Sequence, residues 1–488
     1  MADDLTLGID FGTSAVKVVA LAADGTVAAQ ASRPYATYKP AADRAEQEPQ
    51  DWWDALCAAT HEMMAALDPA CVVAAGLSGQ LNGVVLVDAN GVVLGRSHIW
   101  LDQRCARETA ELRQFHADAL AVTSSPISPI AVLPKLQWLK RHEPERIAAA
   151  SRVFQVKDYI LWRLTGALAT DANEASATSL MDLGRRAWDD RLVELAGIDA
   201  AQLCPILPAS RMAGRVTPAA ASQTGLPVGL GVAPGAGDTG ALGVGCGAFA
   251  TGTVAVTLGT AGHVVASVPN RPQGIAPGLW RMAHVAPDRE LWLGLIPAGG
   301  LSIAWLRRIG RGFGGRDLDF SDLERLAQDV PPGSDGAVFL PFLEGAGTPW
   351  NDPARLAGYG GLSVAHEAGH LVRAVYEGVA FNVRACLERF EQEGVVLDRV
   401  HLAEGGAQSP LWCQIIADAL GRDVHVVAER DTSAIGAAIL ARAATGTDDL
   451  DSVIARSVRI ARVHRPDPAA RDAIQASLAL FARQAGAF

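Results

Sequence analysis

A carboxylate stands beside a small, hydroxyl-rich turn near the start of the chain. An apolar run leads into Asp10, Gly12, Thr13 and Ser14, and a second apolar run, which carries Lys17, follows. The backbone N–H groups and the two hydroxyls of such a turn can bind a phosphate. Because the Asp10 carboxylate would repel a bare phosphate, we expect it to hold a cation between them, most simply Mg²⁺ and through water. The segment, Lys17 included, is predicted to bind nucleotide phosphates.

The same pattern returns, with changes, in the second half of the chain. Two apolar runs between 254 and 265 flank Gly259 and Thr260, which predicts another strand–turn–strand unit for phosphate. Further on, an apolar run ends at Gly405, Gly406 and Ala407, where the absence of bulky side chains would let an adenosine moiety lie against the backbone. Two phosphate-type hairpins so far apart indicate two similar domains that face one nucleotide.

A third element supplies a base. Asp238 follows Gly237 at the end of a small, apolar run, and its glycine neighbours would let an acceptor hydroxyl come close. Phosphoryl transfer needs a metal-neutralised polyphosphate, anion donors and a group that orients or deprotonates the acceptor. Each motif alone is commonly just a turn, but the set in this order favours a phosphotransferase with Asp238 as general base. No glycine precedes a lysine, which excludes a Walker A loop, and no convincing dinucleotide-binding unit is present.

Size, charge and cysteine usage narrow the class of protein. The 488 residues predict two to four domains, and the formal charge of −11 disfavours binding to nucleic acid or to anionic membranes. The seven scattered cysteines, with no Cys-x-x-Cys pair, predict buried thiols in a reducing compartment. The acidic start and the lack of a long apolar run predict a cytoplasmic protein without a signal peptide or membrane span.

Strands and helices alternate in both halves, which predicts an α/β fold. Residues 5–32 are expected to form strands, about 49–67 a helix, 72–78 a buried strand and 84–94 a hairpin, and residues 105–230 to be mostly helical. Further helices are expected at about 299–309, 364–393, 408–421, 434–444 and 467–485. The glycine- and alanine-rich stretch 247–252 is the best candidate for a hinge.

One other motif points to different chemistry. His366, Glu367 and His370 match the H-E-x-x-H pattern of zinc hydrolases on a predicted helix. No third ligand follows at the expected spacing, and Gly369 weakens a helix that would carry ligands. A polar first helical turn is the simpler interpretation, and the zinc hydrolase remains a distant alternative.

The order of the motifs resembles the FGGY carbohydrate kinases over nearly the whole chain. The stretches that carry this resemblance are 8–14, 46–53, 79–83, 99–104, 134–139, 157–166, 237–238, 258–260, 348–349, 373–378 and 405–407. It implies two actin-like, ribonuclease H-like domains with mixed sheets flanked by helices and a cleft between them. Residues 1–248 would bind the sugar and hold the base, and residues 249–488 would bind the nucleotide. ATP and Mg²⁺ would be the cofactors, and a homodimer is possible.

Within the family the chain looks most like a xylulokinase, so D-xylulose to D-xylulose 5-phosphate is the expected reaction. Gln80, Leu81, Asn82 and Trp100 are the expected sugar contacts, with Asp238. Leu81-Asn82 stands where glycerol kinases carry Arg-Glu, which disfavours glycerol, whereas ribulose, L-xylulose and erythritol remain alternatives.

Two departures from the family pattern bear on the substrates. Ala346-Gly347 replaces a charged pair, and Glu404 stands where a third glycine is usual. A non-catalytic nucleotide-binding relative is another alternative, and the presence of both Asp10 and Asp238 argues against it.

Overall fold

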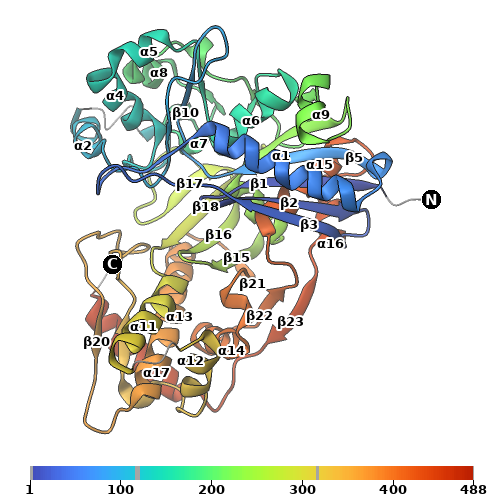
Figure 1. Ribbon diagram of the computed structural model, residues 1–488. Coiled ribbons are helices and arrows are strands. Elements are labelled where there is room, and N and C mark those ends of the chain that lie inside the picture. Colours follow the sequence, from blue (N-terminus) through green and yellow to red (C-terminus); the bar gives the residue numbers. More distant parts are fainter. Residues whose placement is uncertain (1–3, 116–120, 315–317, 487–488) are drawn as a thin grey trace.

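Each half of the chain folds around one large mixed β-sheet. The computed structural model describes residues 4–115, 121–314 and 318–486 and shows two lobes, one above the other in Figure 1. The sheet of the first lobe has the strand order β13-β14-β5-β1-β2-β3. These strands are β1 (Leu5–Phe11), β2 (Ala15–Ala22), β3 (Val27–Pro34), β5 (Val72–Gly79), β13 (Gly214–Arg215) and β14 (Gly231–Gly237).

The second lobe repeats this arrangement. Its sheet has the order β17-β18-β16-β15-β21-β22-β23. The strands are β15 (Gly252–Leu258), β16 (Gly262–Pro269), β17 (Trp280–Ala283), β18 (Arg289–Ile296), β21 (Leu397–Ala403), β22 (Val424–Val427) and β23 (Ile460–His464). In both sheets an antiparallel set (β3-β2-β1 and β18-β16-β15) continues into two parallel strands (β5-β14 and β21-β22). The predicted α/β architecture is confirmed.

The two phosphate-type hairpins form for the reason that the sequence indicates. All residues of β1 and of β15 are buried, as expected for central strands covered on both faces. Each strand then turns tightly into an antiparallel neighbour, so that Asp10 pairs with Lys17 across β1 and β2, and Leu258 pairs with Gly262 across β15 and β16. Both turns therefore lie at the ends of central strands.

Helices cover both faces of the first sheet. Helix α1 (Pro49–Ala66) begins at Pro49, as predicted, because a proline lacks only an N–H that the first turn leaves unpaired anyway. Its buried tryptophans Trp52 and Trp53 belong to the core that includes Leu7 and Ile9 of β1. Helix α15 (Thr432–Ala444), which comes from the second half of the chain, packs on β1 and β5 from the other side.

Residues 105–230 are less helical than predicted. Helices α2 (Ala106–Phe115), α4 (Val132–His142), α5 (Pro144–Ala149), α6 (Val156–Thr165), α7 (Ala172–Ala177), α8 (Asp190–Ala196) and α9 (Pro218–Thr224) occur there. Short strands interrupt them: β8 (Arg152–Phe154), β9 (Thr170–Asp171), β10 (Met181–Asp182), β11 (Ala187–Trp188) and β12 (Ile206–Leu207). The predicted hairpin at 84–94 is also only partly formed, because β6 (Val85–Val87) pairs with β8, while Val93 makes an isolated bridge. Such two- and three-residue pairings depend on distant partners, which local periodicity does not reveal.

The remaining elements complete the two lobes. In the first lobe these are β4 (Glu46–Gln47), η1 (Pro69–Cys71), β7 (Ser97–His98), η2 (Ala200–Gln202) and α10 (Asp238–Gly245). In the second half they are α11 (Gly300–Gly314), α12 (Phe320–Gln328), η3 (Ser334–Gly336), β19 (Val338–Leu340), β20 (Gly358–Gly360), α13 (Ala368–Gln392), η4 (Gly406–Gln408), α14 (Pro410–Leu420), α16 (Leu450–Ser457) and α17 (Arg471–Ala485). Across the described residues, no helix combines the length and the apolar character that a membrane span requires.

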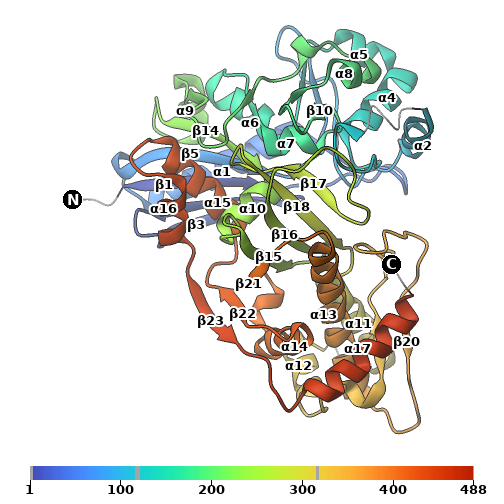
Figure 2. The same cartoon turned by 180° about the vertical axis from the view of Figure 1, so that it is seen from behind.

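Helices α10 and α15 cross between the two sheets (Figure 2). A Cβ atom on Gly436 of α15 would lie 1.9 Å from the carbonyl oxygen of Ala241 in α10, and one on Gly245 would lie 1.9 Å from the carbonyl oxygen of Thr432. The same helix α15 touches the sheet, since a Cβ on Gly8 would lie 1.8 Å from the Ala434 oxygen. Only glycine permits such close backbone contact.

We predict that Gly8→Ala destabilises the protein by about 3 kcal/mol, because the added methyl meets a backbone oxygen that no side-chain rotation can move away. Chemical denaturation measures this change. The matched control is Gly312→Ala on the exposed part of α11, where a Cβ meets nothing within 4 Å. It should leave stability unchanged or raise it by about 0.5–1 kcal/mol. Equal stability of Gly8→Ala and the native protein would contradict the close packing of α15.

Candidate active site

Five charged residues from distant parts of the chain meet where the two lobes join. Asp10 and Lys17 come from the first hairpin, Asp238 begins α10, Glu404 follows β21, and Asp431 precedes α15. We call this group the interlobe cluster. The Lys17 ammonium lies 2.7 Å from Asp431, the charges of Asp10, Lys17 and Asp431 act on the pKa of Glu404, and the charges of Asp10 and Glu404 raise the pKa of Asp238, so the five groups lie close together. The structure thus brings the predicted metal-binding and base carboxylates into one site.

Asp10 is fixed inside the cluster. Its Oδ1 accepts a hydrogen bond of 2.8 Å from the Ser78 hydroxyl, which comes from the parallel neighbour β5. Burial raises the pKa of Asp10, while the hydrogen bond from Ser78 and the charge of Lys17 oppose that rise. A buried carboxylate with one engaged oxygen suits a ligand that faces a cation through water.

Asp238 has the environment of a general base. Its Oδ1 accepts hydrogen bonds from the Thr239 backbone N–H at 2.6 Å and from the Thr239 hydroxyl at 3.2 Å. Among the described residues, its Oδ2 accepts none. Burial, followed by the negative charge of Asp10, raises the pKa of Asp238 to about 7. A carboxylate with a pKa near neutrality and a free oxygen can take a proton from a hydroxyl at physiological pH.

Lys17 joins the two lobes rather than standing free for a phosphate. Its ammonium group lies 2.7 Å from the Asp431 carboxylate, at the start of α15. Although burial alone would lower the pKa of Lys17, the hydrogen bond and the charge of Asp431 outweigh burial, and the pKa is raised. Direct contact between Lys17 and a phosphate stays a prediction.

Hydrogen bonds from three side chains fix the turn of the first hairpin. Trp100 Nε1 donates to the Thr13 hydroxyl at 2.9 Å, Gln47 Nε2 donates to the Thr13 carbonyl at 2.7 Å, and the Tyr35 hydroxyl donates to the Gly12 carbonyl. Ser14 is exposed at the tip. The carbonyl oxygens of Gly12 and Thr13 therefore have partners. Trp100, a predicted sugar contact, is hydrogen-bonded to the turn that is predicted to bind phosphate.

The second hairpin is held in a similar way. The carbonyl oxygens of Gly259 and Thr260 accept hydrogen bonds of 2.7 and 3.0 Å from the first two N–H groups of α11. Gly405 and Gly406 lie against Leu258, the last residue of β15, because Cβ atoms there would meet it at 3.6 and 2.6 Å. Ala407 follows at the same place and is buried. The predicted adenosine and phosphate segments are thus adjacent.

The predicted sugar residues line the end of β5. Gln80 Nε2 donates to the Gln47 side chain at 2.7 Å, while Gln80 Oε1 and Asn82 Oδ1 are buried without a hydrogen-bond partner in the described part of the chain. Leu81 lies against Gly237, next to the base, since a Cβ on Gly237 would be 2.2 Å from its Cδ2. Buried acceptors without partners are costly unless a ligand or water supplies the hydrogen.

A buried ion cluster that the sequence does not predict lies near Asp238, since a Cβ on the preceding Gly237 would be 3.2 Å from Glu174 Oε2. The Lys157 ammonium lies 2.9, 3.0 and 4.0 Å from Asp158, Asp171 and Glu174, all of them buried. Burial raises the pKa of Glu174 well above its usual value, and both of its oxygens lack hydrogen-bond partners among the described residues. The only signal in the sequence was Lys157-Asp158, one of the stretches behind the family resemblance.

The H-E-x-x-H segment does not form a metal site. Helix α13 begins at Ala368, so the predicted helix carrying both histidines is wrong: His366 precedes it. His370 Nδ1 accepts the Glu367 N–H at 3.0 Å, and its Nε2 lies 3.1 Å from Asp335, so it caps the helix. No cluster of three or more His, Cys, Asp or Glu able to hold a metal occurs within residues 4–115, 121–314 and 318–486.

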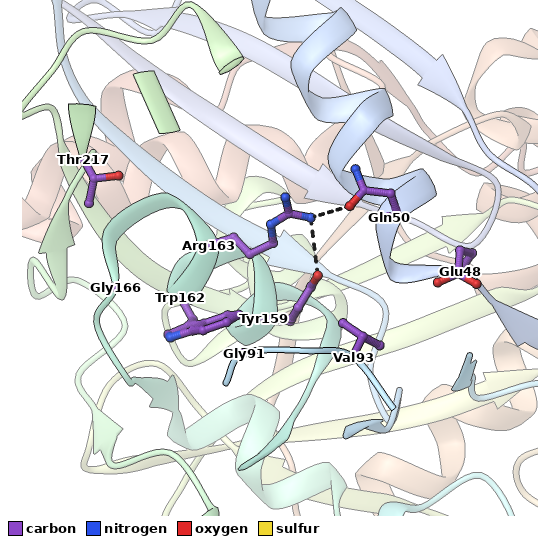
Figure 3. Close-up of a pocket in the computed structure, with 9 residues that line it drawn as sticks. All are labelled: Glu48, Gln50, Gly91, Val93, Tyr159, Trp162, Arg163, Gly166 and Thr217. Carbon is purple, nitrogen blue, oxygen red and sulfur yellow. Dashed lines mark hydrogen bonds between the residues drawn. The ribbon is translucent and has the colours of Figure 1, made fainter. Parts of the chain in front are cut away.

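A separate hollow of about 580 Å³ opens on the first lobe (Figure 3). Tyr159, Trp162 and Arg163 of α6 line it, with Gln50 at the start of α1. The Arg163 guanidinium donates to Gln50 at 2.9 Å and to Tyr159 at 3.4 Å, so its charge is already engaged. Of the residues that line this hollow, none belongs to the predicted site.

Comparisons with known proteins identify the family of the chain. The N-terminal domain of the FGGY family of carbohydrate kinases matches residues 5–245, and its C-terminal domain matches residues 254–445. A xylulose kinase of Escherichia coli (strain K12) is 29% identical over 94% of each chain. A gluconokinase of Bacillus subtilis (strain 168) is also 29% identical, over 95% of this chain and 91% of that one. The crystal structure of xylulose kinase from Rhodospirillum rubrum superposes with a TM-score of 0.90 at 32% identity and covers 98% of each chain. The chain therefore belongs to the FGGY family of carbohydrate kinases.

Proposed function

We propose that this kinase transfers the terminal phosphoryl group of Mg-ATP to a hydroxyl of a ketopentose, with D-xylulose to D-xylulose 5-phosphate as the leading reaction. One observation carries the proposal: Asp238, with a free carboxylate oxygen, lies in the same cluster as Asp10 and directly follows Gly237, which pairs with Gly79 at the strand end that leads into Gln80 and Asn82 with their unpartnered acceptors. A metal-facing carboxylate, a base and open acceptors for hydroxyls are what a sugar kinase requires.

In this proposal each residue has one task. Asp10 would hold Mg²⁺ through water, and the Gly12–Ser14 and Gly259–Thr260 turns would bind the phosphates. Gly405, Gly406 and Ala407 would lie against the adenosine. When bound, Mg²⁺ and the triphosphate would supply charge neutralisation and the phosphoryl group. The fit rests on the buried Asp10 carboxylate, since Mg²⁺ commonly takes one or two protein carboxylates and completes its shell with phosphates and water.

Asp238 would move the proton. Its Oδ2 takes the proton of the sugar hydroxyl as the sugar oxygen bonds to the terminal phosphorus, and the bond between that phosphorus and ADP breaks. Hydrogen bonds from Thr239 to the other oxygen hold the carboxylate in place during the transfer. The first lobe would thus bind the sugar and hold the base, and the second would bind the nucleotide.

The charges around the sugar end favour a neutral substrate. Lys157 is committed to three carboxylates, and Lys135 donates to the carbonyl oxygens of Asn82 and Ile130 at 2.7 Å each. A sugar acid such as gluconate would bring an extra carboxylate to a strand end where these lysines are already engaged. A coupled ADP-release assay should therefore compare D-xylulose, D-ribulose, L-xylulose, erythritol and gluconate. Turnover highest with gluconate would refute the ketopentose proposal while leaving the kinase reaction intact.

We predict that Asp238→Asn lowers kcat by roughly 10²–10⁴-fold and leaves ATP affinity nearly unchanged, because the amide cannot accept the hydroxyl proton. Steady-state kinetics and calorimetric ATP titration test the two parts. The control is Asp472→Asn on the exposed face of α17, which removes the same charge far from the cluster. Turnover of Asp238→Asn close to that of the control would remove Asp238 from the role of base.

The pH dependence follows from the raised pKa of Asp238, about 7. The base acts only when deprotonated, so activity is lost as the pH falls through this value. We expect kcat/KM to be highest above pH 7.5 and to fall about tenfold per unit below pH 6. Initial rates between pH 5.5 and 8.5, with the coupling enzymes in excess, measure the profile. A flat profile across this range would contradict the assignment.

Asn82→Gly isolates the sugar contact. Asn82 has a left-handed backbone with φ 66°, which glycine adopts freely, so the change removes the side chain without straining the turn. Losing the contact should raise the KM for the sugar by roughly tenfold and leave the KM for ATP unchanged. A rise in both KM values, or in neither, would show that Asn82 only shapes the turn.

A further inference from the structure

Glu404 occupies a backbone conformation that usually belongs to glycine. It stands between β21 and η4 with φ 67°, in the left-handed region where a side chain is disfavoured. Strained non-glycine residues of this kind persist where the surrounding structure holds them, and they are common at functional sites. The conformation alone does not explain why a glutamate stands there.

The side chain of Glu404 reaches across to the second phosphate-type hairpin. Its Oε2 lies 2.8 Å from the point where a Cβ on Gly259 would be, so the carboxylate lies directly against the Gly259 backbone. Within the described residues, this carboxylate accepts no hydrogen bond. A carboxyl group without a hydrogen-bonded partner, negatively charged above its pKa of about 7, therefore lies on the turn that is predicted to receive phosphate.

The charges that face Glu404 are mostly of the same sign. Lys17, Asp10 and Asp431 are the groups that influence its pKa, and the ammonium of Lys17 is committed to Asp431 at 2.7 Å. Asp238 also lies within electrostatic range. When ionised, the cluster holds four carboxylates against one ammonium, and a nucleotide triphosphate is itself strongly anionic.

We propose that Glu404 is a specificity-determining residue that makes nucleotide binding depend on a divalent cation. Its carboxylate repels a metal-free triphosphate from the Gly259 turn, whereas the bound cation offsets this repulsion, so the chain selects the metal-loaded nucleotide. The inference rests on the proposed function, which sets the nucleotide at this turn, and goes beyond it by naming the residue that discriminates between the two forms of the nucleotide.

The test compares nucleotide affinity with and without Mg²⁺. Calorimetric titration of the full chain with ATP, in Mg²⁺ and separately in EDTA, gives two dissociation constants for each variant. Glu404→Gln removes the charge and keeps the strained backbone, whereas Glu404→Gly removes both. The matched control is Glu429→Gln, because Glu429 pairs with Arg459 at 2.9 Å near the surface of the same lobe.

Both Glu404 variants should bind metal-free ATP at least about tenfold more tightly than the native chain, since a like charge close to the phosphates is gone. Their affinity for Mg-ATP should change less than threefold, and Glu429→Gln should change neither constant. Glu404→Gly should also melt at a higher temperature than Glu404→Gln, because only glycine relieves the strain.

Three results would overturn the proposal. Weaker Mg-ATP binding by Glu404→Gln would make Glu404 a favourable metal contact. Equal tightening with and without Mg²⁺ would remove the cation dependence, and no change in either constant would leave Glu404 without a role in binding. If the native chain bound no nucleotide in either buffer, the proposed function itself would fail, which is a distinct outcome.

Discussion

The close contact between the backbones of α10 and α15 holds the two lobes together and brings the charged residues of the interlobe cluster into one place. Helix α10 follows the first sheet but packs toward the second, where a Cβ on Gly243 would meet Leu291 at 3.3 Å and Val265 at 3.7 Å. Helix α15 follows the second sheet but packs on the first, through Gly8. Each of these two helices thus follows the sheet of one lobe in the sequence and packs against the sheet of the other. The first residue of α10 is Asp238 and the residue before α15 is Asp431, so this packing places two charges of the cluster directly.

A hydrogen bond adds to this coupling, because the Ser433 hydroxyl donates to the Asp238 carbonyl at 3.2 Å. A movement of α15 against α10 would therefore also move the backbone of Asp238, the proposed base. The ion pair between Lys17 and Asp431 joins the first hairpin to the same helix terminus. Any change in the relative position of the lobes has to preserve or rearrange these contacts, so that position and the orientation of the Asp238 carboxylate are mechanically linked.

The electrostatics of the cluster are consistent with the cation that we propose. A carboxylate at a helix N-terminus is usually stabilised in its charged form, which would lower the pKa of Asp238. Burial and the nearby charge of Asp10 outweigh this effect and raise it to about 7. Burial also raises the pKa of Glu404 to about 7. The charge of Lys17 opposes this rise, and the charges of Asp10 and Asp431 add to it. A cation beside Asp10 would lower the pKa of both groups, so that a larger share of Asp238 would be ionised in the complex with the metal-loaded nucleotide than in the free protein.

The sequence alone was enough to predict the hairpins and the helix start that depend on residues close together in the chain. The apolar runs on either side of Gly12 and Gly259 specified both hairpins, and Pro49 marked the start of α1. Long-range contacts were not accessible in this way. Nothing in the 434–444 stretch shows that the helix lies on β1, and the short strands among the first lobe's helices form only because distant partners meet them. The prediction that His366 lies on the helix with His370 was wrong for a local reason, since the helix begins two residues later, at Ala368.

A polar residue with a left-handed backbone follows one strand of each sheet, three residues after β5 at Asn82 and directly after β21 at Glu404. Strands β5 and β21 are each the parallel neighbour of the central strand, and each leads into a polar residue with a left-handed backbone: Asn82 with φ 66° and Glu404 with φ 67°. Such conformations cost about 1–3 kcal/mol for most residues and less for asparagine. Asn82 leaves a buried acceptor unpaired, and the Glu404 carboxylate lies against the Gly259 backbone. The residue type at each position fits the role proposed for it: an amide suits the hydroxyls of a neutral sugar, and the proposed discrimination between metal-free and metal-loaded nucleotide requires a carboxylate.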